Sequence, residues 1–298
     1  MSLHETSGPP EAPPAHPAPP YPPELPAGVV PRDGRPAWKP SFAWLSLVAA
    51  LAFAVVVGGI VAAAITAAVG GNLDDTPPGA VLASTVLQDV GFIAIPIFFA
   101  AMVARPRPWQ FGLRRTRLWP AAGWVIATYL AFLVFSAVFV TVFGIEAEDQ
   151  VTERLGLEDS DIALAFSALV ICVMAPVAEE FLFRGFMFPA LRRWRGTWPA
   201  AVIVGSLFGL IHVAGSPLEF IPLLMFFGIA LCLLYVRTKS LYPCIALHAL
   251  NNSVAFSSGV DWTWQLGILL PAVAAVLVLV ALLVERVFGP APLRPLPV

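Results

Sequence analysis

The chain has 298 residues, of which 58% are hydrophobic and only 12% charged, and its mean hydropathy is +0.82. These values lie far outside the range of a soluble globular domain and indicate an integral membrane protein. The formal net charge of -2 gives no reason to expect nucleic-acid binding, so the lipid bilayer is the partner that the composition implies.

Residues 1–40 differ from the rest of the chain. They hold 13 of the 30 prolines and show almost no aliphatic periodicity. Such a segment cannot bury enough apolar surface to offset the entropy lost on ordering. We therefore expect a disordered, proline-rich cytoplasmic tail, followed by a transmembrane domain over residues 41–290.

Apolar runs of the length needed to cross a bilayer, about 20 helical residues, recur after residue 42. Continuous apolar runs predict helices, because a strand of a membrane barrel would alternate apolar and polar residues. The fold class predicted is all-α: a polytopic helical membrane bundle of about eight transmembrane helices with a buried polar active site. The expected spans are about 43–69, 80–104, 119–144, 162–192, 198–215, 219–236, 241–259 and 265–286.

The loops predict the orientation. Basic residues follow the second span, namely Arg105, Arg107, Arg114, Arg115 and Arg117. Acidic residues follow the third, namely Glu146, Glu148, Asp149, Glu153, Glu158 and Asp159. With the N-terminus inside, every Lys and Arg except Arg154 falls at or toward a cytoplasmic end, as the positive-inside rule requires. We expect a multi-pass protein of the cell membrane with both termini cytoplasmic, and residues 105–119 as either an interfacial segment or a plain basic loop.

The fourth span contains three charges within the sequence EEFLFRGF, residues 179–186. An ionisable group inside a bilayer costs at least a few kcal/mol and is usually paired or functional. Glu180 and Arg184 are four residues apart, so on a helix they can form an ion pair. Glu179 is left over, and a free carboxylate in an apolar setting is suited to act as a general base.

Two of the four histidines, His212 and His248, fall in apolar spans. A single buried histidine is more often a packing residue than a catalyst. His212 ends the sequence FGLIH, and His248 begins HALNN, which puts Asn252 on the same helical face as His248. A glutamate, two histidines and an asparagine could therefore converge.

Convergence depends on depth in the membrane. If the fourth span ended at Ala178, Glu179 would lie at the inner surface, too far from His212 to meet it. We therefore predict that Pro176 breaks this helix and that the helix continues to Arg193, which moves the glutamates toward mid-depth.

Three other residues of the spans have simpler expected roles. Asp89 lies in the second span and could line the site, but a structural hydrogen bond to a neighbouring helix is the more common role for such a residue. Gly185 and Gly228 are expected to allow close helix approach.

The three motifs EEFLFR, FGLIH and HALNN resemble, in the same order, the EExxxR, FxxxH and HxxxN signatures of the CAAX-protease and bacteriocin-processing (CPBP) family of intramembrane proteases. The resemblance covers roughly residues 80–260, with the motif core at about 160–260. Each motif is a weak signal alone, whereas the set in family order is a strong one.

The resemblance implies an endopeptidase that cleaves a membrane-associated peptide or protein. Glu179 and His212 would activate water, and His248 and Asn252 would stabilise the oxyanion. Glu180 and Arg184 would hold the site together. The family is often described as metalloproteases, so Zn²⁺ is a possible cofactor, with Glu179 or Glu180 joining His212 and His248 as ligands. The sequence contains no HExxH motif, and the metal-free scheme is slightly favoured on mechanism.

Two alternatives remain at this point. A catalytically idle member of the same family would bind a membrane partner or act as an immunity protein. A proton-coupled transporter would also carry buried Glu, Asp and His residues, although no internal repeat is detectable. The many Arg, Ala, Val and Pro residues hint at a GC-rich bacterial genome.

Overall fold

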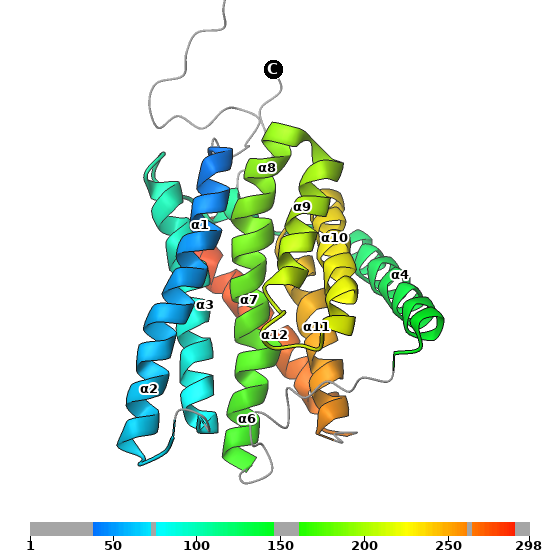
Figure 1. Cartoon of the computed structure of the whole chain (residues 1–298). Coiled ribbons are helices and arrows are strands. Elements are labelled where there is room, and N and C mark those ends of the chain that lie inside the picture. Colours follow the sequence, from blue (N-terminus) through cyan, green and yellow to red (C-terminus); the bar gives the residue numbers. More distant parts are fainter. Residues whose placement is uncertain (1–37, 73–75, 146–160, 261–263, 290–298) are drawn as a thin grey trace, which may run out of the picture.

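The computed structural model describes residues 38–72, 76–145, 161–260 and 264–289. These residues form eight helical rods and, within the described ranges, no strand (Figure 1). The all-α prediction is therefore confirmed. The predicted tail falls almost entirely outside the described residues.

The first and fourth rods are each continuous runs of shorter segments. The first joins α1 (Pro40–Phe53), η1 (Ala54–Gly58) and α2 (Gly59–Ala68); the fourth joins α6 (Asp161–Leu169), η4 (Val170–Met174), α7 (Ala175–Glu180), η5 (Phe181–Met187) and α8 (Phe188–Arg195). The others are α3 (Pro78–Ala101), α4 (Leu118–Phe143), α9 (Thr197–Leu210), α10 (Ile221–Thr238), α11 (Tyr242–Gly259) and α12 (Leu266–Phe288). Two short 3₁₀ turns, η2 (Pro108–Phe111) and η6 (Leu218–Phe220), lie before α4 and α10.

Six of the rods are long and apolar enough to cross a membrane. The exceptions are α9, whose 14 residues span only about 21 Å, and α11, which carries His248 and Asn252. The chain is a multi-pass membrane protein.

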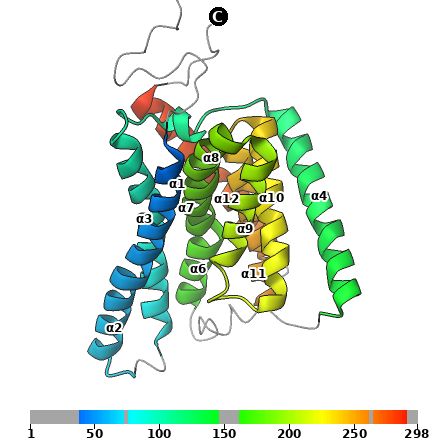
Figure 2. The same cartoon turned by 45° about the horizontal axis from the view of Figure 1, so that its top comes forward.

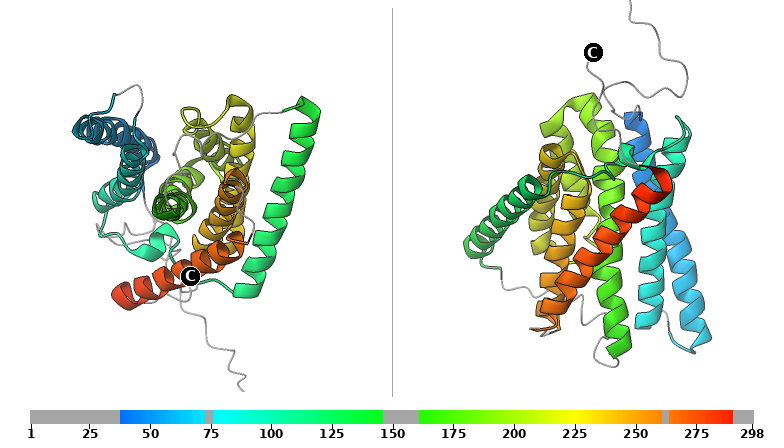
Figure 3. Two further views of the ribbon diagram at one scale, coloured as in Figure 1. Left: turned by 90° about the horizontal axis from the view of Figure 1, so that it is seen from below. Right: turned by 180° about the vertical axis from the view of Figure 1, so that it is seen from behind.

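The continuous helix α6–α8 is the centre of the bundle and the most buried of the six long helices. Seen from below, α1 to α3 lie on one side of it and α9, α10 and α4 on the other (Figure 3). Helix α12 crosses behind the bundle and α4 flanks α10 at its edge (Figure 2). This arrangement places the polar motif EEFLFR in the middle of an apolar assembly.

The predicted break at Pro176 is wrong, because the helix runs without interruption from Asp161 to Arg195. The π-helical segment η4 comes directly before α7, and Pro176 lies at the start of α7. A π-helical turn already departs from the i→i−4 ladder, so a residue without an N–H is accommodated there without a kink.

The fifth helix is shorter than predicted. It ends at Leu210, and residues 211–216 form turns in which the N–H groups of Gly215 and Ser216 bond to the carbonyl of His212. Gly215, Ser216 and Pro217 are residues that favour turns over helix. His212 therefore lies just beyond the C-terminus of α9.

The basic segment before α4 is a strap fixed to the corner between α10 and α11. The N–H of Leu241 bonds to the carbonyl of Gly112 at 2.8 Å, and Ser240 Oγ donates to the carbonyl of Arg114 at 2.6 Å. Thr116 Oγ1 donates to the carbonyl of Thr238 at 3.2 Å. These hydrogen bonds give the segment a structural role that neither the interfacial nor the plain-loop interpretation includes.

Candidate active site

The two glutamates of EEFLFR lie on α7, between the π-helical segments η4 and η5. Glu179 is 7% exposed and Glu180 is fully buried. π-helical segments are rare and occur frequently at functional sites, because they turn side chains away from the regular helical face. Here they flank the short stretch that carries both carboxylates.

Glu180 forms the predicted ion pair with Arg184. Arg184 Nη1 donates to Glu180 Oε1 at 2.7 Å, and both side chains are fully buried. Arg184 Nη2 donates to the carbonyl of Gly228 at 2.9 Å, and the guanidinium lies 4.5 Å from the centre of the Phe208 ring. The cation therefore connects the central helix to both α9 and α10.

Gly228 makes this connection possible, as predicted, by allowing close helix approach. A Cβ at Gly228 would lie 2.8 Å from the backbone of Gly205 on α9. At Gly185 the close neighbour is instead the carbonyl of Phe111 in η2, which would lie 3.2 Å from a Cβ at that position, so a 3₁₀ turn rather than a helix approaches there.

His212 is oriented by its own backbone neighbourhood. Its Nδ1 lies 2.7 Å from the carbonyl oxygen of Phe208, one helical turn earlier. A carbonyl only accepts, so Nδ1 carries the proton, and in the neutral ring Nε2 holds the lone pair. That Nε2 lies 3.8 Å from Glu179 Oε2.

His248, on α11, is oriented by Glu180. Its Nδ1 lies 2.9 Å from Glu180 Oε1, the same oxygen that Arg184 contacts. Because this oxygen already accepts from Arg184, it also acts as the acceptor here, and the His248 Nδ1–H donates. The His248 Nε2 then faces Glu179 Oε2 at 3.9 Å.

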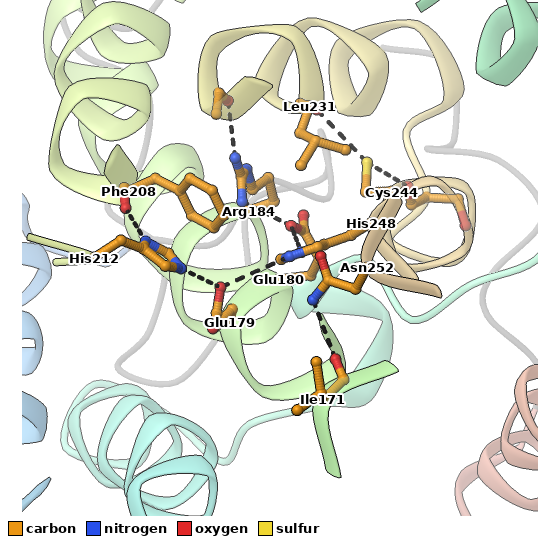
Figure 4. Close-up of polar contacts among 12 residues, drawn as sticks. Ile171, Glu179, Glu180, Arg184, Phe208, His212, Leu231, Cys244, His248 and Asn252 are labelled. Atoms are coloured by element: carbon orange, nitrogen blue, oxygen red, sulfur yellow. Dashed lines mark hydrogen bonds and ion pairs between the residues drawn. The ribbon is translucent and has the colours of Figure 1, made fainter. Parts of the chain in front are cut away.

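Both imidazoles therefore turn Nε2 toward one oxygen of Glu179 (Figure 4). This oxygen has no hydrogen-bond partner among the described residues. The separations of 3.8 and 3.9 Å are too long for direct hydrogen bonds, and polar contacts of this length are commonly bridged by water. The arrangement can hold a water molecule between a carboxylate and an imidazole acceptor.

Asn252 lies on α11, one turn beyond His248, with its amide directed toward the central helix (Figure 4). Its Nδ2 donates to the carbonyl of Ile171 at 3.1 Å. Ile171 belongs to η4, so this bond ties α11 to the π-helical segment that precedes the glutamates. A primary amide has two N–H donors, and the predicted oxyanion contact would use the second.

The donor types around Glu179 fit a zinc site. Two imidazoles whose Nδ1 is held by a hydrogen bond and whose Nε2 faces Glu179, together with that carboxylate, are the residue types of a His₂Glu catalytic site. No three such side chains in the described residues are spaced closely enough to hold a metal ion as they stand. Ligand atoms of tetrahedral zinc lie about 3.3 Å apart, so Glu179, His212 and His248 would have to close by about 0.5 Å.

Asp89 departs from its expected role. It lies on α3 and is 2% exposed, and neither carboxylate oxygen has a hydrogen-bond partner among the described residues. The predicted structural hydrogen bond to a neighbouring helix is therefore wrong for the part of the chain that the structure describes.

Sequence reasoning missed the groups that orient the motif side chains. These groups are the backbone carbonyls of Phe208, Gly228 and Ile171. Every residue has a backbone carbonyl, so the residue type does not show which carbonyl will be used. Phe208 could have been found from the sequence, because it is the first residue of the FGLIH motif. Its ring centre lies 5.0 Å from that of His212 and 5.5 Å from that of His248.

Residues 161–254 match the family described as Rce1-like, type II CAAX prenyl endopeptidase Rce1-like. This segment contains every residue of the predicted site. The similarity to this family therefore covers the segment that carries all three motifs. The match falls within the motif core expected at about 160–260.

The chain is also 29% identical over 136 residues to the "Putative membrane peptidase YdiL" of Bacillus subtilis (strain 168), which covers 46% of this chain and 53% of that protein. The chain thus spans about half the length of this relative. No solved structure matches the chain. Both of these matches are to proteins described as peptidases, which supports a peptidase at the level of the family.

Proposed function

We propose that this protein is an intramembrane endopeptidase of the CPBP type that hydrolyses a peptide bond of a membrane-associated peptide or protein. The observation that carries the proposal is the convergence of the His212 and His248 Nε2 atoms on one oxygen of Glu179, which accepts no hydrogen bond from the residues that the structure describes. A carboxylate and an imidazole nitrogen side by side can both accept hydrogen bonds from one water molecule, and these are the elements of general-base catalysis.

In this scheme Glu179 accepts a proton from water while His212 accepts a hydrogen bond from the same molecule. The water oxygen attacks the carbonyl carbon of the scissile bond and forms a tetrahedral oxyanion. The C–N bond then breaks as the proton held by Glu179 passes to the leaving nitrogen, which restores the carboxylate.

His248 needs a proton on Nε2 to donate to that oxyanion. Because its Nδ1–H donates to Glu180, His248 acts as an oxyanion donor only in its imidazolium form. The carboxylates of Glu179 and Glu180 lie on the two sides of this ring, at 3.9 and 2.9 Å from its nitrogens. Asn252 supplies the second donor with the N–H that Ile171 does not use.

The same histidine orientations favour a second candidate for the catalytic type. Neutral His212 and His248 both direct a lone pair toward Glu179, as zinc ligands held by outer hydrogen bonds do. Bound there, Zn²⁺ would act as a Lewis acid and make its water more acidic. His212, His248 and Glu179 would hold it, and Glu180 and the Phe208 carbonyl would keep the imidazoles in place.

The deciding experiment compares peptide termini, by mass spectrometry, in cells that express wild type, Glu179→Gln or Glu219→Gln at matched abundance. Glu219 is an exposed acid on η6 and serves as the control. We expect wild type and Glu219→Gln to produce the same new termini and Glu179→Gln to lose them at least about 100-fold. Identical profiles in all three would contradict proteolysis and favour a partner-binding protein.

The catalytic type is separated on the purified protein with a peptide that spans a cleavage site found in this way. Activity that survives exhaustive chelation supports direct catalysis by Glu179 and His212. Activity that is lost on chelation and restored by Zn²⁺, but not by Mg²⁺, supports the zinc scheme.

A further inference from the structure

Asp89 is a buried acid that the proposed chemistry does not use. It lies near the middle of α3, about 17 Å from either end, so it is at mid-depth in a membrane-spanning helix. Neither carboxylate oxygen has a partner among the described residues. Buried acceptors without donors are costly, and each one in a native protein calls for an explanation, such as a catalytic role or a bound group.

The face of α3 that carries Asp89 is fixed by its neighbours. A Cβ at Gly91 would lie 2.6 Å from the ring of Phe53, so the Gly91 side of α3 packs against α1. Asp89 is two residues away, which is about 200° around the helix, and therefore lies on the opposite side.

That opposite side faces the central helix. Leu82, seven residues before Asp89 and on the same face, packs in a cluster with Val170 and Cys172 of η4. Helix α3 also contacts α7 directly, and Asp89 lies within electrostatic range of Glu179. Asp89 thus belongs to the surroundings of the candidate base, and it approaches that base from α3 rather than from the helices that carry the histidine motifs.

A substrate segment beside Glu179 would need acceptors. Peptide bonds in a helix have their N–H groups already bonded, and hydrolysis requires local unwinding to expose the carbonyl. Each N–H released in this way must find a partner inside the apolar bundle. Asp89 has two buried carboxylate oxygens, and neither accepts a hydrogen bond from the described residues.

We propose that Asp89 is a substrate-binding residue whose carboxylate oxygens accept hydrogen bonds from backbone N–H groups of a peptide unwound beside Glu179. This inference rests on the proposed endopeptidase function. It assigns α3, which lies outside the family match, a direct contact with substrate.

The test combines kinetics with thermal stability for purified wild type, Asp89→Leu and Asp89→Asn, using a fluorogenic peptide that spans a cleavage site mapped from Glu179-dependent termini. For Asp89→Leu we expect KM to rise about tenfold or more and kcat to change less than about threefold. The melting temperature should stay the same or rise, because an unpartnered acid is replaced by an apolar side chain of similar size. Asp89→Asn keeps one acceptor and should show a smaller rise in KM.

Ser84→Ala is the matched control on the same helix. Ser84 bonds within α3 and faces η1, where a Cβ at Gly58 would lie 3.4 Å from its Cβ, so its removal should leave KM unchanged. An unchanged KM in Asp89→Leu, or a fall in melting temperature that accounts for the lost activity in both Asp89 variants, would overturn the inference. Full activity of Glu179→Gln would instead reject the proposed function, and with it this inference.

Discussion

Among single residues, Glu180 connects Arg184 of the central helix with His248 of α11. One of its oxygens accepts from both Arg184 and His248, so the ion pair and the candidate histidine share a buried carboxylate. The pair neutralises two charges that the bilayer would otherwise penalise, and it fixes which nitrogen of His248 is protonated. Removal of Arg184 should therefore affect stability and the histidine together.

We predict that Arg184→Met destabilises the protein by about 3–5 kcal/mol, because it leaves the charge of Glu180 buried without compensation. The double variant Glu180→Gln with Arg184→Met should be more stable than Arg184→Met alone, since no charge remains unpaired. Unfolding titrations with SDS in mixed micelles measure both effects.

The control for this prediction is the ion pair between the exposed Arg115 Nε and the partly exposed Glu285 Oε1, which are 2.6 Å apart. Arg115→Met should change the unfolding free energy by less than about 1 kcal/mol, because exposed pairs contribute little. Equal losses for Arg115→Met and Arg184→Met would show that burial of the Glu180 pair is not what makes it important.

Among the helices, the contact between α9 and α10 positions the site. Gly205 and Gly228 let the two backbones approach, and the carbonyl of Gly228 then meets Arg184 of the central helix. His212 follows the end of α9 directly, so the separation of α9 from its neighbours sets the distance between His212 and Glu179.

We predict that Gly228→Ala destabilises the protein by about 1–3 kcal/mol and lowers activity, because the new methyl group would meet backbone atoms that cannot move aside. Gly267→Ala on α12 is the matched control, since nothing lies within 4 Å of a Cβ there. The control should be neutral or slightly stabilising, as alanine favours helix over glycine. If both variants unfold at the same SDS concentration, the close approach of α9 and α10 is not limiting.

At the scale of the whole molecule, charge is gathered at one end of the bundle. The strap before α4 meets the α10–α11 corner through the contact of Arg114 with the Lys239 carbonyl, and it meets the end of α12 through the ion pair of Arg115 with Glu285. Helix α1 begins and α12 ends on this same side (Figures 1 and 3). The positive-inside rule predicts that this side is cytoplasmic.

We predict that single cysteines at positions 107 and 193 react with a membrane-impermeant maleimide only after inside-out vesicles are made. A cysteine at position 214, in the turn beyond His212, should react from the opposite side. The three native cysteines, Cys172, Cys232 and Cys244, are buried and should give little background. Labelling with the opposite sidedness would reverse the assigned orientation without altering the fold.

The sequence by itself determined the helical class, the limits of the eight helices to within about five residues, and the Glu180–Arg184 pair. These features depend on local properties of the sequence: the length of the apolar runs, the Gly and Pro residues near helix ends, and the i,i+4 spacing of the two charges. Such properties can be recognised without knowledge of the packing. The motifs also identified Glu179, His212 and His248 as candidates for one site, although they lie far apart in the chain.

Only the tertiary structure decided how these residues meet. Continuity of the helix through Pro176 depends on the π-helical segment η4, and the ring orientations depend on the Phe208 carbonyl and on Glu180 from another helix. Packing likewise decides that neither carboxylate oxygen of Asp89 has a hydrogen-bond partner in the part of the chain that the structure describes. Backbone carbonyls and helix irregularities carry no residue-type signal, because every residue has the same backbone and its partner is chosen by packing across helices.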